Sequence, residues 1–157
     1  MLSIFKKKID KNLYAPVDGK CIDITEVKDN VFATKTMGDG VAIEPSNNVI
    51  CSPCNGVITM LFPSNHAFGV KMDDGKEVLV HIGIDTVKLN GKGFKAFRKE
   101  KDRVKAGDPV IELDKDLLIS KGYDVTTILV ITDAANDIIT KINMNRKVLC
   151  NDKIICC

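Results

Sequence analysis

The chain has 157 residues, of which 45% are hydrophobic and 28% charged, a size and composition that support one sizeable hydrophobic core but hardly two. Lysines and arginines number 23 and aspartates and glutamates 21, so the formal net charge of +2 argues against a dedicated nucleic-acid-binding protein. The longest apolar runs are far shorter than the roughly 18 to 20 residues that cross a bilayer, and Met1 to Phe5 does not resemble a secretory signal. We therefore expect a single cytoplasmic domain.

The start of the chain is interpreted as a short flexible leader, residues 1–13, ahead of a domain spanning residues 14–157. Apolar residues at the start are followed by Lys6 to Lys8. A weak basic amphipathic turn at a membrane surface is the alternative for this segment.

Turn signals such as Asp18-Gly19, Asn55-Gly56 and Ala106-Gly-Asp-Pro109 separate short runs rich in Val, Ile, Thr and Phe. Evenly spaced short strands of this kind are typical of an all-β fold, a single antiparallel sandwich or barrel, and not of alternating βαβ units. Very little helix is expected, with one short candidate from Lys115 to Lys121 that stops at Gly122. The predicted strands are 20–25, 40–44, 57–62, 68–72, 77–82, 109–113 and 126–132.

The six cysteines include one CxxC pattern, Cys51-Ser-Pro-Cys54, which could be a redox site or half of a zinc site. No second CxxC is present to complete a zinc ribbon, and Pro53 with Asn55-Gly56 predicts a turn where a thioredoxin-like site needs a helix. We favour a structural role for this pair. The final Cys156-Cys157 is expected to be exposed.

The chain has only two histidines, His66 and His81, and a strong hairpin signal, Asp73-Asp-Gly75, lies between them. With a two-residue or four-residue loop, Phe68 lies opposite His81. Because side chains alternate between faces, His66 then projects from the same face as His81, about 7 to 8 Å away. A three-residue loop would place the two histidines on opposite faces.

Two convergent imidazoles favour a functional site over a hydrogen-bonded histidine at a sheet rim. A zinc site needs a third ligand, and no HxxxH pattern supplies one. A hydrolytic Ser or Cys in a nucleophile elbow is also absent from the sequence. The remaining interpretation is that an imidazole is itself the nucleophile, since its ordinary pKa of about 6.5 leaves it largely neutral near pH 7. Phosphoryl transfer through a histidine fits this chemistry.

Six motifs, in order and without large gaps from about Tyr14 to Ile131, make the chain resemble the glucose-class IIA component of the bacterial sugar phosphotransferase system. The resemblance implies a single antiparallel β-sandwich that takes a phosphoryl group from the carrier HPr and passes it to the IIB domain of a sugar permease. The motifs are Ala15-Pro-Val-Asp-Gly19, Val31-Phe-Ala33 with Met37-Gly-Asp-Gly40, Asn65-His-Ala-Phe68, Val80-His-Ile-Gly-Ile-Asp-Thr-Val87, Leu89-Asn-Gly-Lys-Gly-Phe94 and Val104-Lys-Ala-Gly-Asp108.

The resemblance also implies the roles of the site residues. His81 is the phosphorylated nucleophile, and the backbone carbonyl of Gly83 orients its ring. His66 stabilises the phosphoryl group, and the hydroxyl of Ser64 orients His66. Fixing Nδ1–H of the nucleophile leaves the lone pair on Nε2, which makes this arrangement chemically sensible.

Around the histidines the resemblance implies a partner-docking collar, with Phe32, Phe62, Leu79 and Val87 as its apolar members and Asp29 and Asp85 as its carboxylates. An apolar rim excludes water while the phosphoryl group passes between proteins. Ordinary core packing is the alternative for Phe62 and Leu79, and capping of the following turn is the alternative for Asp85. Pro63 stands where relatives often have an acidic or polar residue.

The expected partners are HPr as donor and a permease IIB domain as acceptor, with further regulatory protein targets left open. Contact with a membrane is expected only through the permease, and no nucleic acid is expected. No cofactor is required. The alternative function is a regulatory binding module in which His66, His81 and a partner's carboxylate hold zinc at an interface.

Overall fold

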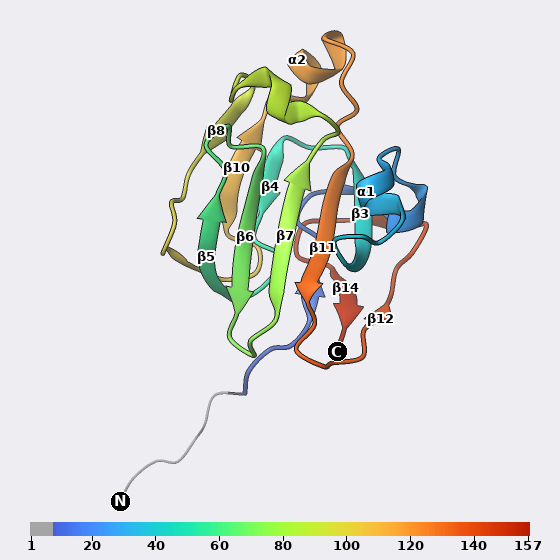
Figure 1. Cartoon of the computed structure of the whole chain (residues 1–157), viewed down its shortest axis with the longest axis vertical. Coiled ribbons are helices and arrows are strands. Elements are labelled where there is room, and N and C mark those ends of the chain that lie inside the picture. The colour runs from blue at the N-terminus through green and yellow to red at the C-terminus, as the bar shows by residue number, and fades with distance from the viewer. Residues whose placement is uncertain (1–7) are drawn as a thin grey trace, which may run out of the picture.

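The computed structural model describes residues 8–157, which form a sandwich of antiparallel β-sheets (Figure 1). The expectation of an all-β antiparallel sandwich with little helix is confirmed, because every strand pair within residues 8–157 is antiparallel. The eight-stranded sheet runs in the order β13 (Lys147–Val148), β2 (Gly19–Asp23), β3 (Asp39–Pro45), β11 (Thr127–Asp133), β7 (Glu77–Ile82), β6 (Ala67–Met72), β5 (Gly56–Leu61) and β9 (Arg103–Val104).

Two three-stranded sheets complete the sandwich. Their orders are β4 (Val49–Cys51), β10 (Pro109–Leu113), β8 (Phe94–Ala96) and β1 (Leu13–Tyr14), β14 (Lys153–Cys156), β12 (Thr140–Lys141). All seven predicted strands are present, and so is the predicted helix, α2 (Lys115–Ser120). The short strands outside these seven were not predicted, nor were α1 (Asn30–Ala33) and the two 3₁₀ turns, η1 (Ile24–Glu26) and η2 (Thr86–Leu89). These segments are too short to produce a readable periodicity.

The large sheet is covered on both faces. Its inner face packs on the two small sheets in the main core, which includes Phe68, Val80 and Leu129. A second, smaller cluster lies on the outer face, where residues such as Leu79 and Ile128 are covered by apolar residues of η1 and α1. This double burial explains why β7 and β11 read as nearly continuous apolar runs, and it places apolar cover beside the outward-facing side chains of β7.

The β6–β7 hairpin has a three-residue loop, so the predicted register is wrong by one residue. The N–H of Met72 donates to the carbonyl of Lys76 at 2.8 Å, and the loop residue Gly75 adopts φ of 96°. Ala67, not Phe68, lies opposite His81. A three-residue hairpin loop requires a residue in the left-handed region, which Gly75 supplies. The same Asp-Gly pair also favours a two-residue turn, so the sequence alone does not distinguish the two loop lengths.

Leu13, which we assigned to the leader, lies in β1 and is fully buried, so it is part of the folded domain. The suggested amphipathic turn falls almost wholly on residues 1–7, outside the described residues. In the part of the chain that the structure describes, no helix combines the length and apolar character needed to traverse a bilayer.

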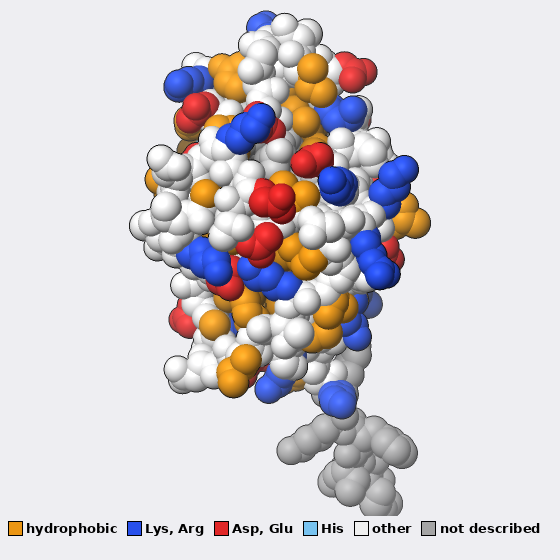
Figure 2. Space-filling view, turned by 90° about the vertical axis from the view of Figure 1, so that its right-hand side faces the viewer, with side chains coloured by type: hydrophobic (Ala, Val, Ile, Leu, Met, Phe, Trp, Pro, Cys, Tyr) orange, Lys and Arg blue, Asp and Glu red, His pale blue; other side chains and the backbone are white. Residues whose placement is uncertain are grey.

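The described cysteines are all free thiols. Cys51 and Cys54 are buried around a turn after β4, as a structural role predicts. Cys157 is exposed, but the expectation for Cys156 is wrong: it is half-buried because β14 includes it. On the side of the molecule turned to the viewer in Figure 2, acidic and basic side chains are interspersed, in keeping with the small net charge.

Candidate active site

His81 lies near the end of β7, the strand between β6 and β11 in the large sheet. Its backbone neighbours across the ladder are Ala67 on β6 and Ile128 on β11. Both neighbours belong to the outer cluster, together with Leu79 two residues earlier on the same strand. Because side chains alternate along a strand, the His81 ring projects from this outer face, at the edge of an apolar layer.

The chain turns sharply after β7 and thereby fixes the ring of His81. Nδ1–H of His81 donates to the carbonyl of Gly83 at 2.9 Å, and a carbonyl can only accept. The neutral ring therefore carries its lone pair on Nε2. Gly83 has φ of 79°, and a Cβ there would lie 2.5 Å from Cγ2 of Thr86 and 2.9 Å from the carbonyl oxygen of Asp124, so only glycine fits.

His66 reaches the same place from a tight turn that precedes β6. Asn65 has φ of 56°, and its N–H donates to the carbonyl of Phe62 at 2.8 Å. His66 thus stands outside β6, where strict alternation of faces does not apply. For this reason the two histidines converge, although we expected a three-residue hairpin loop to place them on opposite faces of the sheet. The ring centroids of His66 and His81 are 5.2 Å apart, and the rings are nearly perpendicular at 82°.

Ser64 lies where the sequence places it. Its hydroxyl is hydrogen-bonded to Nδ1 of His66. Both Nδ1 atoms of the histidine pair are therefore engaged, and among residues 8–157 neither Nε2 has a hydrogen-bond partner. The two Nε2 atoms are the positions left for a ligand or a reacting group.

Both imidazoles are held in the neutral form. Burial lowers the pKa of His81 to about 4, with a further lowering from the neighbouring His66, while the Gly83 carbonyl and the carboxylates of Asp29 and Asp85 act in the opposite direction. Burial also lowers the pKa of His66. Near pH 7 the site thus presents an unprotonated imidazole nitrogen beside a second neutral ring.

The apolar members of the predicted collar differ in exposure. The ring of Phe32 is 5.0 Å from that of His81, and the ring of Phe62 is 5.3 Å from that of His66. Phe32 and Leu79 are buried, at 4% and 8% exposed, so they pack beside the site and contribute little to its surface. Val87 is 52% exposed and can meet a partner directly. Phe62 is half-buried.

Sequence reasoning missed two residues near the collar. Val31, beside Phe32 on α1, is 49% exposed, and only its place in the Val31-Phe-Ala33 motif could have singled it out. Asn90 shares a shallow depression with His66. The depression is lined by Phe62, Pro63, Ser64, His66, Val87 and Asn90.

The two predicted carboxylates have different local roles. The side chain of Asp29 accepts the N–H of Val31 at 2.9 Å and caps α1. Asp85 is exposed and is the N-cap residue of η2, with φ of 58°. Its side chain makes no capping hydrogen bond, and only its backbone carbonyl contributes, by accepting the N–H of Lys88 at 3.1 Å. Across the described part of the chain, no group of three His, Cys, Asp or Glu side chains is arranged to hold a metal ion.

Comparison with known proteins identifies the family to which the chain belongs. Residues 11–137 match the family model described as phosphoenolpyruvate-dependent sugar phosphotransferase system, EIIA 1. The glucose permease IIA from Mycoplasma capricolum has the same fold, with a TM-score of 0.88 and 33% identity over 98% of both chains.

Among sequence relatives, the "PTS system glucose-specific EIIA component" of Bacillus cereus is 42% identical over 92% of this chain and 88% of its own length. The "PTS system glucose-specific EIICBA component" of Staphylococcus saprophyticus is 45% identical over 78% of this chain, which covers only 18% of that longer protein. The chain likewise covers 18% of other EIICBA relatives. With the matched sandwich and the histidine motifs in place, this chain belongs to the glucose-class EIIA family of the sugar phosphotransferase system.

Proposed function

We propose that the protein is a phosphocarrier that accepts a phosphoryl group from phospho-HPr on Nε2 of His81 and passes it to the IIB domain of a glucose-class permease during sugar uptake. The observation that carries this proposal is the pair of neutral imidazoles, 5.2 Å apart, with both Nδ1 atoms engaged and both Nε2 atoms free of protein partners among the described residues. The exchange is proposed to take place in the cytoplasm, where the free thiols of this chain stay reduced.

In the first step, the Nε2 lone pair of His81 attacks the phosphorus of phospho-HPr. A new N–P bond forms while the N–P bond to the HPr histidine breaks, and that histidine leaves with the bonding electron pair. The His81 ring keeps its Nδ1 proton and becomes formally cationic. The Gly83 carbonyl and the carboxylates of Asp29 and Asp85, which all act to raise the pKa of His81, would stabilise that charge. Attack by a nucleophile of the IIB domain reverses these changes.

His66 is proposed to hold the phosphoryl oxygens without forming a bond to phosphorus. To donate from Nε2, its neutral ring must accept a hydrogen bond at Nδ1, and the hydroxyl of Ser64 can supply one. The role of Ser64 is thus to select the tautomer of His66, while the carbonyl of Gly83 selects the opposite tautomer of His81. One ring attacks and the other donates.

A regulatory role through the same surface, including a zinc site completed by a partner's carboxylate, stays a prediction. His66 and His81 would offer two nitrogen ligands, and the third would have to come from the partner. Metal analysis of the isolated protein and of any complex would test it.

The decisive experiment incubates the protein with phosphoenolpyruvate, enzyme I and HPr and then maps the phosphorylated residue by mass spectrometry. We expect one acid-labile, base-stable phosphoryl group on His81, absent from His81→Ala, with the fold of the variant unchanged by circular dichroism. Label on His66 alone would reverse the assignment, and no label on either histidine would refute the proposed function.

A further inference from the structure

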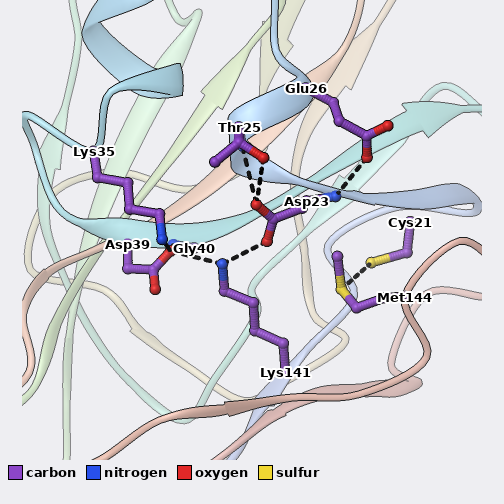
Figure 3. Close-up of polar contacts among 9 residues, drawn as sticks. All are labelled: Cys21, Asp23, Thr25, Glu26, Lys35, Asp39, Gly40, Lys141 and Met144. Atoms are coloured by element: carbon purple, nitrogen blue, oxygen red, sulfur yellow. Dashed lines mark hydrogen bonds and ion pairs between the residues drawn. The ribbon is translucent and has the colours of Figure 1, made fainter.

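The loop between β2 and β3, residues 24–38, brings Phe32 to the site, and one side chain holds both of its ends (Figure 3). Nζ of Lys141 donates to Oδ1 of Asp23, the last residue of β2, and to Oδ1 of Asp39, the first residue of β3, at 2.6 Å in each case. We name these three residues the Lys141 clamp. It bridges the start and the end of the loop.

Each carboxylate of the clamp is also bonded to the loop or strand backbone. Oδ2 of Asp23 accepts the N–H and the hydroxyl of Thr25 at 3.2 and 2.7 Å, and the N–H of Asp23 donates to the side chain of Glu26, closing a capping box around η1. Oδ1 of Asp39 accepts the N–H of Gly40 at 2.8 Å. The ammonium is thus connected to the backbone conformation at both ends of the loop.

The backbone that carries the ammonium is itself anchored. Lys141 pairs with Ile155 in the β12–β14 ladder. Three residues later, the sulfur of Met144 contacts that of Cys21 on β2 at 3.9 Å (Figure 3). The N–H of Asn145 also donates to the Cys21 carbonyl, at 2.8 Å. The C-terminal segment therefore offers a fixed point from which a side chain can restrain the loop.

The three charged side chains of the Lys141 clamp are partly shielded from water, which strengthens the interaction between them. The Lys141 side chain is 17% exposed, and those of Asp23 and Asp39 are 32% and 35% exposed. Burial acts to raise the pKa of Asp23, but the hydrogen bonds from Lys141 and Thr25 outweigh it and hold that pKa at about 2. Two carboxylates bound to one ammonium are close together, so loss of the ammonium would leave them to repel each other, although Nζ of Lys35, 3.6 Å from Oδ1 of Asp39, would still offset part of that charge.

The loop between these ends reaches the nucleophile. Ile24, Val27 and Phe32 pack into the outer cluster with Leu79, and the Phe32 ring lies 5.0 Å from the ring of His81. Movement of the loop ends would shift this cover and admit water to His81. Lys141 lies outside residues 11–137, the part that matches the family model, so the restraint comes from beyond the matched region.

We propose that Lys141 is a positioning residue for phosphoryl transfer: by joining Asp23 to Asp39 it holds the 24–38 loop so that Phe32 covers His81. The inference rests on the proposed function for its consequence in transfer, but its structural part can be tested without any partner protein.

The test compares Lys141→Met, Lys141→Arg and the control Lys147→Met. Lys147 is exposed on β13 and forms no ion pair among the described residues. The first measurement is the pKa of His81 from NMR titration, which is simple because the chain has two histidines. We expect Lys141→Met to raise this pKa by about one unit, as water reaches the ring. Lys141→Arg should restore the parental value, and Lys147→Met should leave it unchanged.

The second measurement is the rate of phosphorylation by phospho-HPr, which should fall about tenfold in Lys141→Met and recover in Lys141→Arg. If Lys141→Met does not fold, Asp39→Asn removes one arm of the clamp and is titrated in its place. An unchanged His81 pKa in a folded variant that has only lost stability would overturn the inference. Failure of the proposed function would look different, since parental protein would then accept no phosphoryl group while the pKa change would persist.

Discussion

The carbonyl of Gly83 accepts the Nδ1–H of His81 at 2.9 Å, and Gly83 has φ of 79°, a backbone conformation that residues other than glycine rarely adopt. Gly83→Ala should therefore disturb the carbonyl that orients the His81 ring. We expect phosphorylation of His81 to slow by about tenfold or more, measured as the initial rate with phospho-HPr. The matched control is Gly75→Ala in the hairpin loop, where φ is also positive, at 96°, but a Cβ has nothing within 4 Å. Equal rates in the two variants would show that the carbonyl has no orienting role.

His66→Ala should slow transfer without removing the acceptor. Loss of a donor aimed at charge that develops in the transition state typically reduces the rate by about 10² to 10³. With excess phospho-HPr and long incubation, phospho-His81 should still approach the parental stoichiometry. A variant that transfers at the parental rate would mean that the contact between the two rings, 5.2 Å apart, has no part in catalysis.

The ionisation of His81 should be displaced to low pH. Because burial lowers its folded-state pKa from 6.5 to about 4, the ring remains unprotonated down to about pH 5.5. NMR titration of the histidine ring carbons should give a midpoint well below 6. A midpoint near 6.5 would contradict the burial seen here.

The same shift affects stability. As pH falls from 6.5 towards 4, the unfolded chain binds a proton at His81 before the folded chain does, so this residue makes the free energy of unfolding decrease across that window. Urea unfolding at several pH values should show a weaker dependence in His81→Gln than in the parental protein. Identical dependences would mean that His81 has similar pKa values in both states.

An exposed charge at the collar should impair both proposed steps, phosphorylation by HPr and transfer to IIB. Phe32 and Leu79 are too buried for a charge to be introduced without cost to folding, whereas Val87 is 52% exposed. Val87→Asp should reduce phosphorylation by HPr and transfer to IIB together, each by about tenfold, because a charge must lose its water when either partner docks. Ile138→Asp, 88% exposed after β11, is the control and should affect neither step. Loss of one step alone would show that the partners dock on different faces.

The hairpin loop opposite the site should contribute to stability and not to transfer. Lys76 is fully buried and its ammonium is bonded to the carboxylates of Asp74 and Asp137, the latter at 2.9 Å. Asp74→Ala leaves a buried cation with one partner and should lower the free energy of unfolding by about 3 kcal/mol, measured in urea. The phosphorylation rate at low temperature should be unchanged, and a large loss of rate in the folded variant would connect this loop to the site.

Sequence reasoning recovered the long strands because Asx-Gly turns and β-branched runs mark them locally. It recovered the histidine pair, but the geometric argument for that pair used the wrong register. His66 reaches His81 through the left-handed turn at Asn65, and single-residue backbone choices of this kind have no signal in a strand pattern. Lys141 could not have been found at all, because its contacts with Asp23 and Asp39 span 118 and 102 residues and exist only once the sheet is assembled.

The cover on both faces of β7 has a consequence for the way partners exchange. β7 is hydrogen-bonded to β6 and β11 and packed on both faces, so its backbone cannot move easily in any direction. A protein that docks at His81 must therefore fit a rigid surface. If the proposed function holds, the entropy lost on docking would come mainly from the partner, and the protein would present the same shape to donor and acceptor. The Ile82 amide, bonded to the His66 carbonyl at 2.8 Å, should accordingly be among the slowest in the chain to exchange with deuterium.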